Sequence, residues 1–256
     1  MMSHRTEFVV VLCRAREAGN VGAVCRAMAA MGLSRLILVG CPEYPPEPVR
    51  TFALKAYPIF ESAPRFDTLE SALADCSLAA GFTRRSGRLR VREPRPLTDF
   101  AREAVGRSGR IALVFGTEAD GLSSSELALC DLAVRIPTAE AFPSLNLAQA
   151  VQIAAWEIAR VLTEPDRGTS PTKTAGPAPR SEIIRAVEDA ADDLARVGFF
   201  KIAGRPALVR FLRSLLARAG VTTRELEYFR SILGKAAALS GRRSGSLRPD
   251  SRRPEP

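Results

Sequence analysis

The chain has 256 residues, which is long enough for one complete α/β domain and a small second unit. Its hydrophobic content of 46% indicates a globular core, and no apolar run reaches the roughly 20 residues that cross a bilayer. The formal net charge of +9 favours a polyanionic partner, although an arginine-rich composition alone would give the same charge. Five scattered cysteines form no CxxC pair, so we expect reduced thiols, a cytoplasmic location and no metal site.

The chain contains a single histidine, His4, close to its N-terminus. The side chain that most often serves as a general base at neutral pH is therefore missing from the body of the sequence. Any chemistry must depend on carboxylates, arginines, a cysteine or the reactivity of a cofactor.

The first 40 residues predict a strand–helix–strand unit. Apolar residues 8–12 predict the first strand, and residues 35–40 (RLILVG) predict the second. Between them we expect a turn at residues 20–22 and a helix that ends at Gly32. The N-terminus of this helix is a potential anion site. The glycines lack the GxGxxG spacing of dinucleotide-binding folds, which argues against a nicotinamide cofactor.

A proline-rich loop and a basic segment follow. We expect a loop at residues 41–49, and the elements after it are helices at 52–56, 68–76 and 97–105 and a strand at 78–82. The strand runs into residues 83–96 (TRRSGRLRVREPRP), which carry six arginines. This segment is either a solvated loop or a surface that contacts RNA phosphates.

The central part of the chain predicts two strands that each end in a loop. The apolar run 111–115 stops at Gly116, and strand 132–136 stops before Pro137. A capping box of Ser123 and Glu126 opens a short helix between them, and a long amphipathic helix extends to residue 163. The loops 116–122 and 137–146 are therefore expected to line one pocket.

The last third of the chain predicts a linker and a small helical unit. Residues 164–180 have a linker composition, and three helical patterns follow at 181–197, 205–219 and 222–239. We expect a disordered basic tail from residue 240. In the middle helix the pattern predicts an apolar buried face (Leu208, Phe211, Leu212, Leu215 and Leu216) and a basic face (Arg205, Arg210, Arg213 and Arg218).

Four segments resemble the SPOUT superfamily of RNA methyltransferases in its TrmH branch. FGTEADGLS, RIPT and SLNLAQAVQ are similar to its three signature segments, and GNVGAVCRAMAAMG is similar to its N-terminal motif. Their order and spacing also agree. Residues 208–236 (LVRFLRSLLARAGVTTRELEYFRSILGKA) resemble the C-terminal helical segment of the TrmJ-type tRNA 2'-O-methyltransferases.

The resemblance implies an α/β domain with a mostly parallel sheet over residues 1–163, whose C-terminal part forms a deep trefoil knot. It also implies a linker at 164–180, an all-α extension at 181–239 and a homodimer that binds RNA. The implied reaction is S-adenosylmethionine-dependent 2'-O-ribose methylation of tRNA, at position 32 of the anticodon loop. Two alternatives stay open: a ribosomal RNA 2'-O-methyltransferase of the same branch, and a non-catalytic RNA-binding relative. We expect no metal and no membrane partner.

The same resemblance implies roles for individual residues. The catalytic set is Asn20, Arg26, Ser144 and Asn146. The cofactor-binding set is Phe82, Thr83, Arg84, Gly116, Ile136, Pro143, Ser144 and Leu145, and the RNA-binding set is Arg84, Arg85, Arg88 and Arg90. Because an arginine stays protonated, we expect Arg26 to anchor phosphate and stabilise an alkoxide instead of acting as a base. Gly87 departs from the family pattern, where an arginine is usual.

Overall fold

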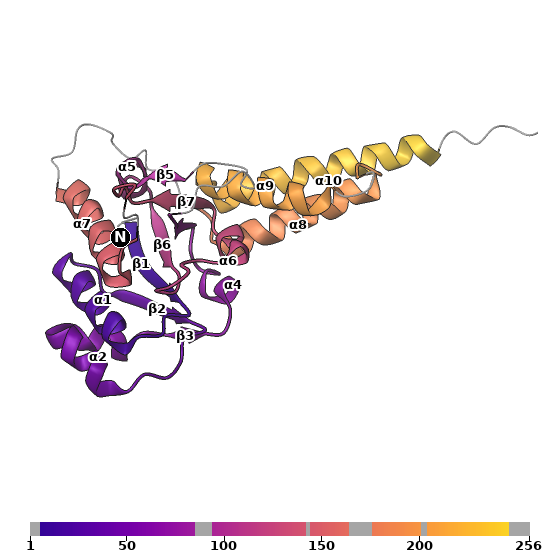
Figure 1. The fold of residues 1–256 in the computed structure, drawn as a ribbon. Coiled ribbons are helices and arrows are strands. Elements are labelled where there is room, and N and C mark those ends of the chain that lie inside the picture. The colour runs from indigo at the N-terminus through magenta and orange to yellow at the C-terminus, as the bar shows by residue number, and fades with distance from the viewer. Residues whose placement is uncertain (1–5, 85–93, 142–143, 164–175, 201–203, 246–256) are drawn as a thin grey trace, which may run out of the picture.

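The computed structural model describes residues 6–84, 94–141, 144–163, 176–200 and 204–245 (Figure 1). Four of the residues expected to bind cofactor or RNA lie outside this range: Arg85, Arg88, Arg90 and Pro143. Within the described residues, no helix is both long and apolar enough to cross a membrane. The same part of the chain contains no group of three or more side chains suited to holding a metal ion.

Seven parallel strands form one sheet in the order β3-β2-β1-β6-β4-β7-β5. Their bounds are β1 Thr6–Cys13, β2 Arg35–Val39, β3 Arg65–Phe66, β4 Leu78–Phe82, β5 Arg95–Pro96, β6 Gly109–Phe115 and β7 Leu132–Arg135. In β1, Val10 and Leu12 enter one core cluster, while Val9 and Val11 enter a second cluster on the other face. Both faces of the sheet are covered, which explains why its strands read as continuous apolar runs.

Helices cover both faces of the sheet (Figure 1). The larger core cluster includes residues of α1 (Ala18–Ala30), α2 (Pro46–Ala53), α5 (Leu97–Val105) and α7 (Leu147–Thr163). The short helices α4 (Leu69–Ala72) and α6 (Ser124–Leu129) lie over the opposite face, and η1 (Leu54–Ala56) and α3 (Tyr57–Glu61) follow α2. The capping box of Ser123 and Glu126 is present at the start of α6, as predicted.

Three local predictions in the first half are wrong. Asn20 lies inside the first turn of α1 and not in a turn before it. Residues 46–49 were expected in a loop but begin α2, because a proline at the first helical position needs no N–H partner. The helix predicted at 68–76 contains only Leu69–Ala72, although Thr68 caps it as expected and accepts from the Ser71 N–H at 3.3 Å.

The C-terminal helices form an arm that projects from the sheet domain (Figure 1). They are α8 (Arg180–Arg196), α9 (Arg205–Ala219) and α10 (Thr223–Gly245), and α8 packs against both others. Thus α8 begins inside the predicted linker, and α10 continues past the predicted boundary at residue 239. On α9, Phe211 and Leu215 are 49% and 39% exposed instead of buried, because α8 and the sheet domain cover a different side of this helix.

A buried ion pair fastens the arm to the sheet domain. Asp131, just before β7, is fully enclosed and bonds to the Arg180 guanidinium, and its Oδ2 also accepts from the Ala79 N–H at 2.9 Å. The Ser214 hydroxyl donates to the Asp131 carbonyl at 2.8 Å, and Arg213 donates to a carbonyl of α6. These contacts lie where β4 and β7 begin, so the arm is attached at the amino ends of the strands.

Candidate active site

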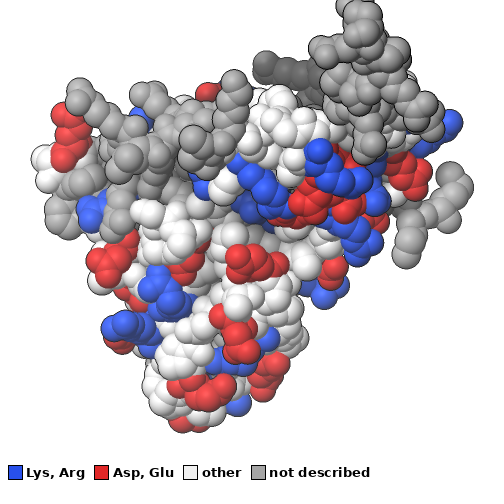
Figure 2. Space-filling view, turned by 90° about the vertical axis from the view of Figure 1, so that its right-hand side faces the viewer, with Lys and Arg blue, Asp and Glu red and all other residues white. Residues whose placement is uncertain are grey.

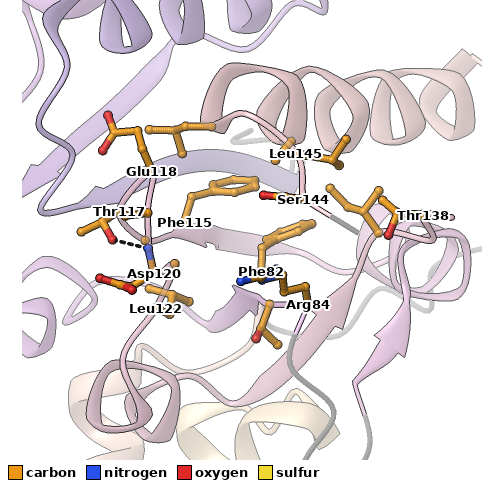
Figure 3. A pocket seen from close by; sticks show the side chains of 17 residues that line it. Phe82, Arg84, Phe115, Thr117, Glu118, Asp120, Leu122, Thr138, Ser144 and Leu145 are labelled. Atoms are coloured by element: carbon orange, nitrogen blue, oxygen red, sulfur yellow. Dashed lines mark hydrogen bonds between the residues drawn. The ribbon is translucent and has the colours of Figure 1, made fainter. Parts of the chain in front are cut away.

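A pocket opens at the carboxyl ends of β4, β6 and β7, at the opposite end of the strands from the arm (Figure 3). Its walls come from both loops that the sequence predicted: residues 116–122 form one wall, and Thr138, Ser144 and Leu145 belong to the other. The two loops meet because β4 separates β6 from β7 by only one strand position. The remaining lining residues are Phe82, Thr83, Arg84, Phe115, Ile136, Leu147 and Ala150.

The centre of the pocket is flat and apolar. The Phe82 and Phe115 rings stack with centroids 4.3 Å apart and an interplanar angle of 17°, and Figure 3 shows Ser144 and Leu145 beside them. Ile136 and Leu145 are partly buried in the same walls. A planar aromatic group fits such a surface, since ring faces stack favourably in an offset arrangement.

Gly116 lets the loop after β6 fold back onto the strand end. A Cβ atom at this position would lie 2.0 Å from the backbone carbon of Gly121, a distance that no side chain tolerates. Thr117 and Gly121 exchange two backbone hydrogen bonds at 3.2 and 2.9 Å, and the Asp120 N–H donates to the Thr117 hydroxyl at 3.1 Å (Figure 3). Gly121 has a φ of +68°, which glycine adopts without strain.

The Glu118 carboxylate connects this loop to the start of α1. It accepts from the backbone N–H groups of Arg16 and Glu17 at 3.2 and 3.1 Å and from the Asn20 amide at 3.2 Å. Burial by itself would raise the pKa of Glu118, but these hydrogen bonds and one from its own N–H outweigh burial. The pKa is therefore held below its usual range, and the group is a carboxylate at neutral pH.

Asn146 continues the same chain of hydrogen bonds. Its Nδ2 donates to Asn20 Oδ1 at 2.9 Å, and its own Oδ1 accepts from the Ala148 N–H at 2.8 Å, which caps α7. Residues 126 positions apart in the sequence are thereby brought into contact. Asn20 and Asn146 thus lie together, beside a pocket that Ser144 lines.

Arg26 is the one member of the predicted catalytic set that the fold places elsewhere. It is exposed on α1 and does not line the pocket. It lies six positions after Asn20 on α1, so the two side chains project from different sides of the helix.

Seven of the eight residues predicted to bind the cofactor line the pocket, and the eighth, Pro143, lies outside the described residues. Phe115 also lines the pocket but was not predicted there, whereas Glu118 and Leu122 belong to the loop 116–122 that was expected to line it. Phe115 reads as an ordinary last residue of a strand, and Leu122 as an ordinary core residue. For Glu118 the available signal was its place inside the first signature segment.

A parallel sheet with a ligand pocket at the carboxyl ends of its central strands defines an α/β enzyme domain that binds a small molecule. Residues 7–156 match the family described as the SpoU rRNA Methylase family. The match covers more than half of the 256 residues. The chain belongs to this family, as the resemblance of its signature segments implied.

Full-length relatives agree with this membership. The chain is 34% identical to the tRNA (cytidine/uridine-2'-O-)-methyltransferase TrmJ of Pectobacterium atrosepticum, over 88% of this chain and 94% of that protein. It is 33% identical to the tRNA (cytidine/uridine/adenosine-2'-O-)-methyltransferase TrmJ of Pseudomonas aeruginosa, over 92% and 97%. The crystal structure of TrmJ from Z. mobilis superposes with a TM-score of 0.71 and 28% identity, covering 89% of this chain and 98% of that one.

Proposed function

We propose that the protein transfers a methyl group from S-adenosylmethionine to a ribose 2'-hydroxyl of tRNA, at position 32 of the anticodon loop. The observation that carries the proposal is the pocket in which seven predicted cofactor residues meet, next to the contact between Asn20 and Asn146. The relatives named above are tRNA 2'-O-methyltransferases, and this chain matches them over nearly their whole length, which supports the choice of substrate.

The pocket residues fit S-adenosylmethionine in shape and polarity. The stacked pair of Phe82 and Phe115, together with Ile136 and Leu145, offers apolar surface for an adenine ring. The absence of a Cβ at Gly116 lets the backbone of Gly121 and Leu122 pack directly on the strand end, which gives this wall of the pocket its shape. When bound, the cofactor supplies an electrophilic methyl group, and the protein must place the acceptor oxygen in line with it.

The polar residues beside the pocket would position the ribose and stabilise charge. Ser144 and Asn146 can hydrogen-bond to the 2'-hydroxyl as it loses its proton. Arg26 remains a cation and would anchor a phosphate and stabilise the alkoxide, with the proton passing to water or to a phosphate oxygen.

We further propose that the active enzyme is a homodimer whose sites form at the interface. Arg26 does not line the pocket of its own chain, so a second copy could supply it. On α7, Ile153 and Trp156 lie three positions apart on one side of the helix and are 36% and 52% exposed, and such large apolar side chains favour burial against a partner. Light scattering should give twice the monomer mass. Trp156→Glu should shift the protein to the monomer and reduce methylation.

The proposed RNA surface has two parts, one at the mouth of the pocket and one on the arm. On the face in Figure 2, acidic and basic side chains are interspersed, so the net charge does not form a uniform basic surface there. Arg84, in contrast, is exposed at the end of β4 and makes no ion pair with a described residue. On the arm, Arg210 is likewise exposed and free of ion pairs within the described part of the chain, whereas Arg205 pairs with Glu188 and Asp192.

We also propose that the chain is threaded as a trefoil knot. β7 lies beyond β4 from β6, whereas α7 packs against α1 and α5. Both described ends of the connection between β7 and α7 line the pocket, through Ile136 and Thr138 on one side and Ser144 and Leu145 on the other, which supports this threading. An experimental structure traced through residues 136–147 tests the threading.

The deciding experiment is methylation of defined RNAs. The protein should be incubated with S-adenosylmethionine and either total tRNA or ribosomal RNA, and new 2'-O-methyl groups should be mapped. We expect methylation of tRNA at position 32. Methylation of ribosomal RNA alone would identify a different member of the same branch. Saturable cofactor binding without turnover on either RNA would refute the proposed activity.

A further inference from the structure

A chain of three hydrogen-bonded side chains links the cofactor loop to the start of α7. Glu118 accepts from Asn20 Nδ2 at 3.2 Å, and Asn20 Oδ1 accepts from Asn146 Nδ2 at 2.9 Å. The three residues come from three different segments: Asn20 from the N-terminal motif, and Glu118 and Asn146 from two of the signature segments. The chain therefore joins the wall of the cofactor pocket to the residues beside the proposed ribose site.

Glu118 determines the donor-to-acceptor direction of this series of hydrogen bonds. An ionised carboxylate can only accept hydrogen bonds, whereas an asparagine amide has one donor end and one acceptor end. Glu118 therefore forces Asn20 to present its NH2 group to the carboxylate and its oxygen to Asn146. Asn146 must in turn present its own NH2 group. If Asn20 were reversed, its oxygen would face the carboxylate and its NH2 group would face that of Asn146.

The other end of Asn146 is already occupied. Its Oδ1 accepts from the Ala148 N–H at 2.8 Å, and its backbone N–H donates to the Gln149 side chain at 3.1 Å. One Nδ2 hydrogen is given to Asn20. The helix-capping contact and the contact with Asn20 leave the second Nδ2 hydrogen of Asn146 available to donate to a substrate.

We propose that Glu118 is a positioning residue that fixes the direction of the Asn20 amide and, together with the Ala148 N–H on Oδ1, that of Asn146, so that Asn146 offers an N–H donor to the ribose 2'-oxygen. This inference rests on the proposed function. A donor at that oxygen stabilises the negative charge that develops as the hydroxyl loses its proton, and a carbonyl oxygen would oppose that charge. Glu118 touches no reacting atom in this scheme, because it acts through Asn20.

Moving the negative charge from position 118 to position 20 tests the donor-to-acceptor direction of these hydrogen bonds. In Glu118→Ala, Asn20 can reverse, and we expect kcat on tRNA to fall by about tenfold or more, up to the 10²- to 10³-fold seen when an oxyanion donor is lost. In Asn20→Asp, the new carboxylate faces Glu118, and like charges at that distance disrupt the contact, so a similar fall is expected.

The double variant Glu118→Ala/Asn20→Asp separates this role from a general need for Glu118. Asp at position 20 can only accept, so it again obliges Asn146 to donate, and no second carboxylate repels it. Asp in the first turn of α1 is also favoured by the helix dipole. We expect its kcat to exceed that of Asn20→Asp by about tenfold, within the coupling seen between contacting residues. Relief of the like-charge repulsion alone would leave kcat at or below that of Glu118→Ala, whereas the positioning role predicts a kcat above that of Glu118→Ala.

Glu126 provides the matched control. It lies on α6, just after this loop, and also contacts the segment after β1, but it accepts from Arg14 at 2.8 and 2.7 Å and not from Asn20. Glu126→Ala combined with Asn20→Asp should therefore show additive losses. Glu118→Gln guards against misfolding, because its oxygen can still accept from Asn20, and its kcat should lie between those of the wild type and Glu118→Ala.

Cofactor affinity, measured by calorimetry for every variant, completes the experiment. Recovery in kcat with similar S-adenosylmethionine affinities supports the positioning role. Additive losses in the double variant, or losses explained by cofactor affinity, overturn it while the wild type still methylates tRNA. A wild-type protein that methylates no RNA would overturn the proposed function itself, which is a separate result.

Discussion

Replacing Gly116 with alanine should open the cofactor pocket from its inner wall. The added Cβ would lie 2.0 Å from the Gly121 carbon, 2.2 Å from the Gly121 oxygen and 2.2 Å from the Leu122 nitrogen. All three are backbone atoms, so no side chain can rotate away. Carbon contacts are comfortable at about 3.5 Å or more, so the two backbone segments must separate by more than about 1 Å.

This separation would act on both stability and binding. Overpacking of this kind typically costs about 1–3 kcal/mol of folding free energy. The displaced residues also line the pocket, and Thr117 would lose one or both of its backbone hydrogen bonds to Gly121. At about 1 kcal/mol for each lost hydrogen bond, together with the altered pocket shape, we expect S-adenosylmethionine affinity to fall by at least about tenfold.

Gly106→Ala is the control. Gly106 has a φ of −78°, and its nearest neighbour to a new Cβ would be the Glu103 oxygen at 3.8 Å, an ordinary contact. Calorimetric titration should show wild-type cofactor affinity for Gly106→Ala, and urea unfolding should give a stability within about 0.5 kcal/mol of the wild type. Equal cofactor affinity in Gly116→Ala and the wild type would refute the close-approach argument.

Three further outcomes are expected. Arg26→Ala should lower kcat/KM for tRNA by about 10²-fold or more and leave cofactor affinity unchanged in calorimetry, because Arg26 lies outside the pocket; an equal loss of both would disprove its role. Arg180→Ala leaves Asp131 as a buried, unpaired charge and should cost about 3–5 kcal/mol in urea unfolding. The exposed Arg196, replaced in the same way, should cost less than about 1 kcal/mol, and similar losses for both arginines would contradict this account. Burial raises the pKa of Glu126, but the hydrogen bonds that it accepts outweigh burial and hold its folded pKa below 4.5. Its contribution to stability is therefore present above about pH 4.5 and is lost as the pH falls through the lowered folded pKa. Glu126→Gln should flatten the decline of unfolding free energy between about pH 5 and pH 3.

Local patterns in the sequence were sufficient for most of the sheet and for the identity of the pocket residues. Strands such as residues 111–115 are recognisable because a strand buried on both faces must be apolar throughout. The Ser123–Glu126 capping box is recognisable because its two hydrogen bonds join residues three positions apart. The signature segments contain four of the seven predicted pocket residues, Gly116, Ile136, Ser144 and Leu145, and the other three, Phe82, Thr83 and Arg84, are consecutive at the end of β4.

Contacts between distant segments were decided by the tertiary structure alone. The hydrogen bond between Asn20 and Asn146 joins residues 126 positions apart, and nothing in either local sequence specifies the partner. The same holds for Asp131 and Arg180, which fasten the arm at the end of the sheet away from the pocket. Sequence determined which residues could do the chemistry, because residue type and local spacing are written in it. Only the path of the folded chain decided which of these residues come into contact, and it placed Arg26 outside the cofactor pocket of the same chain.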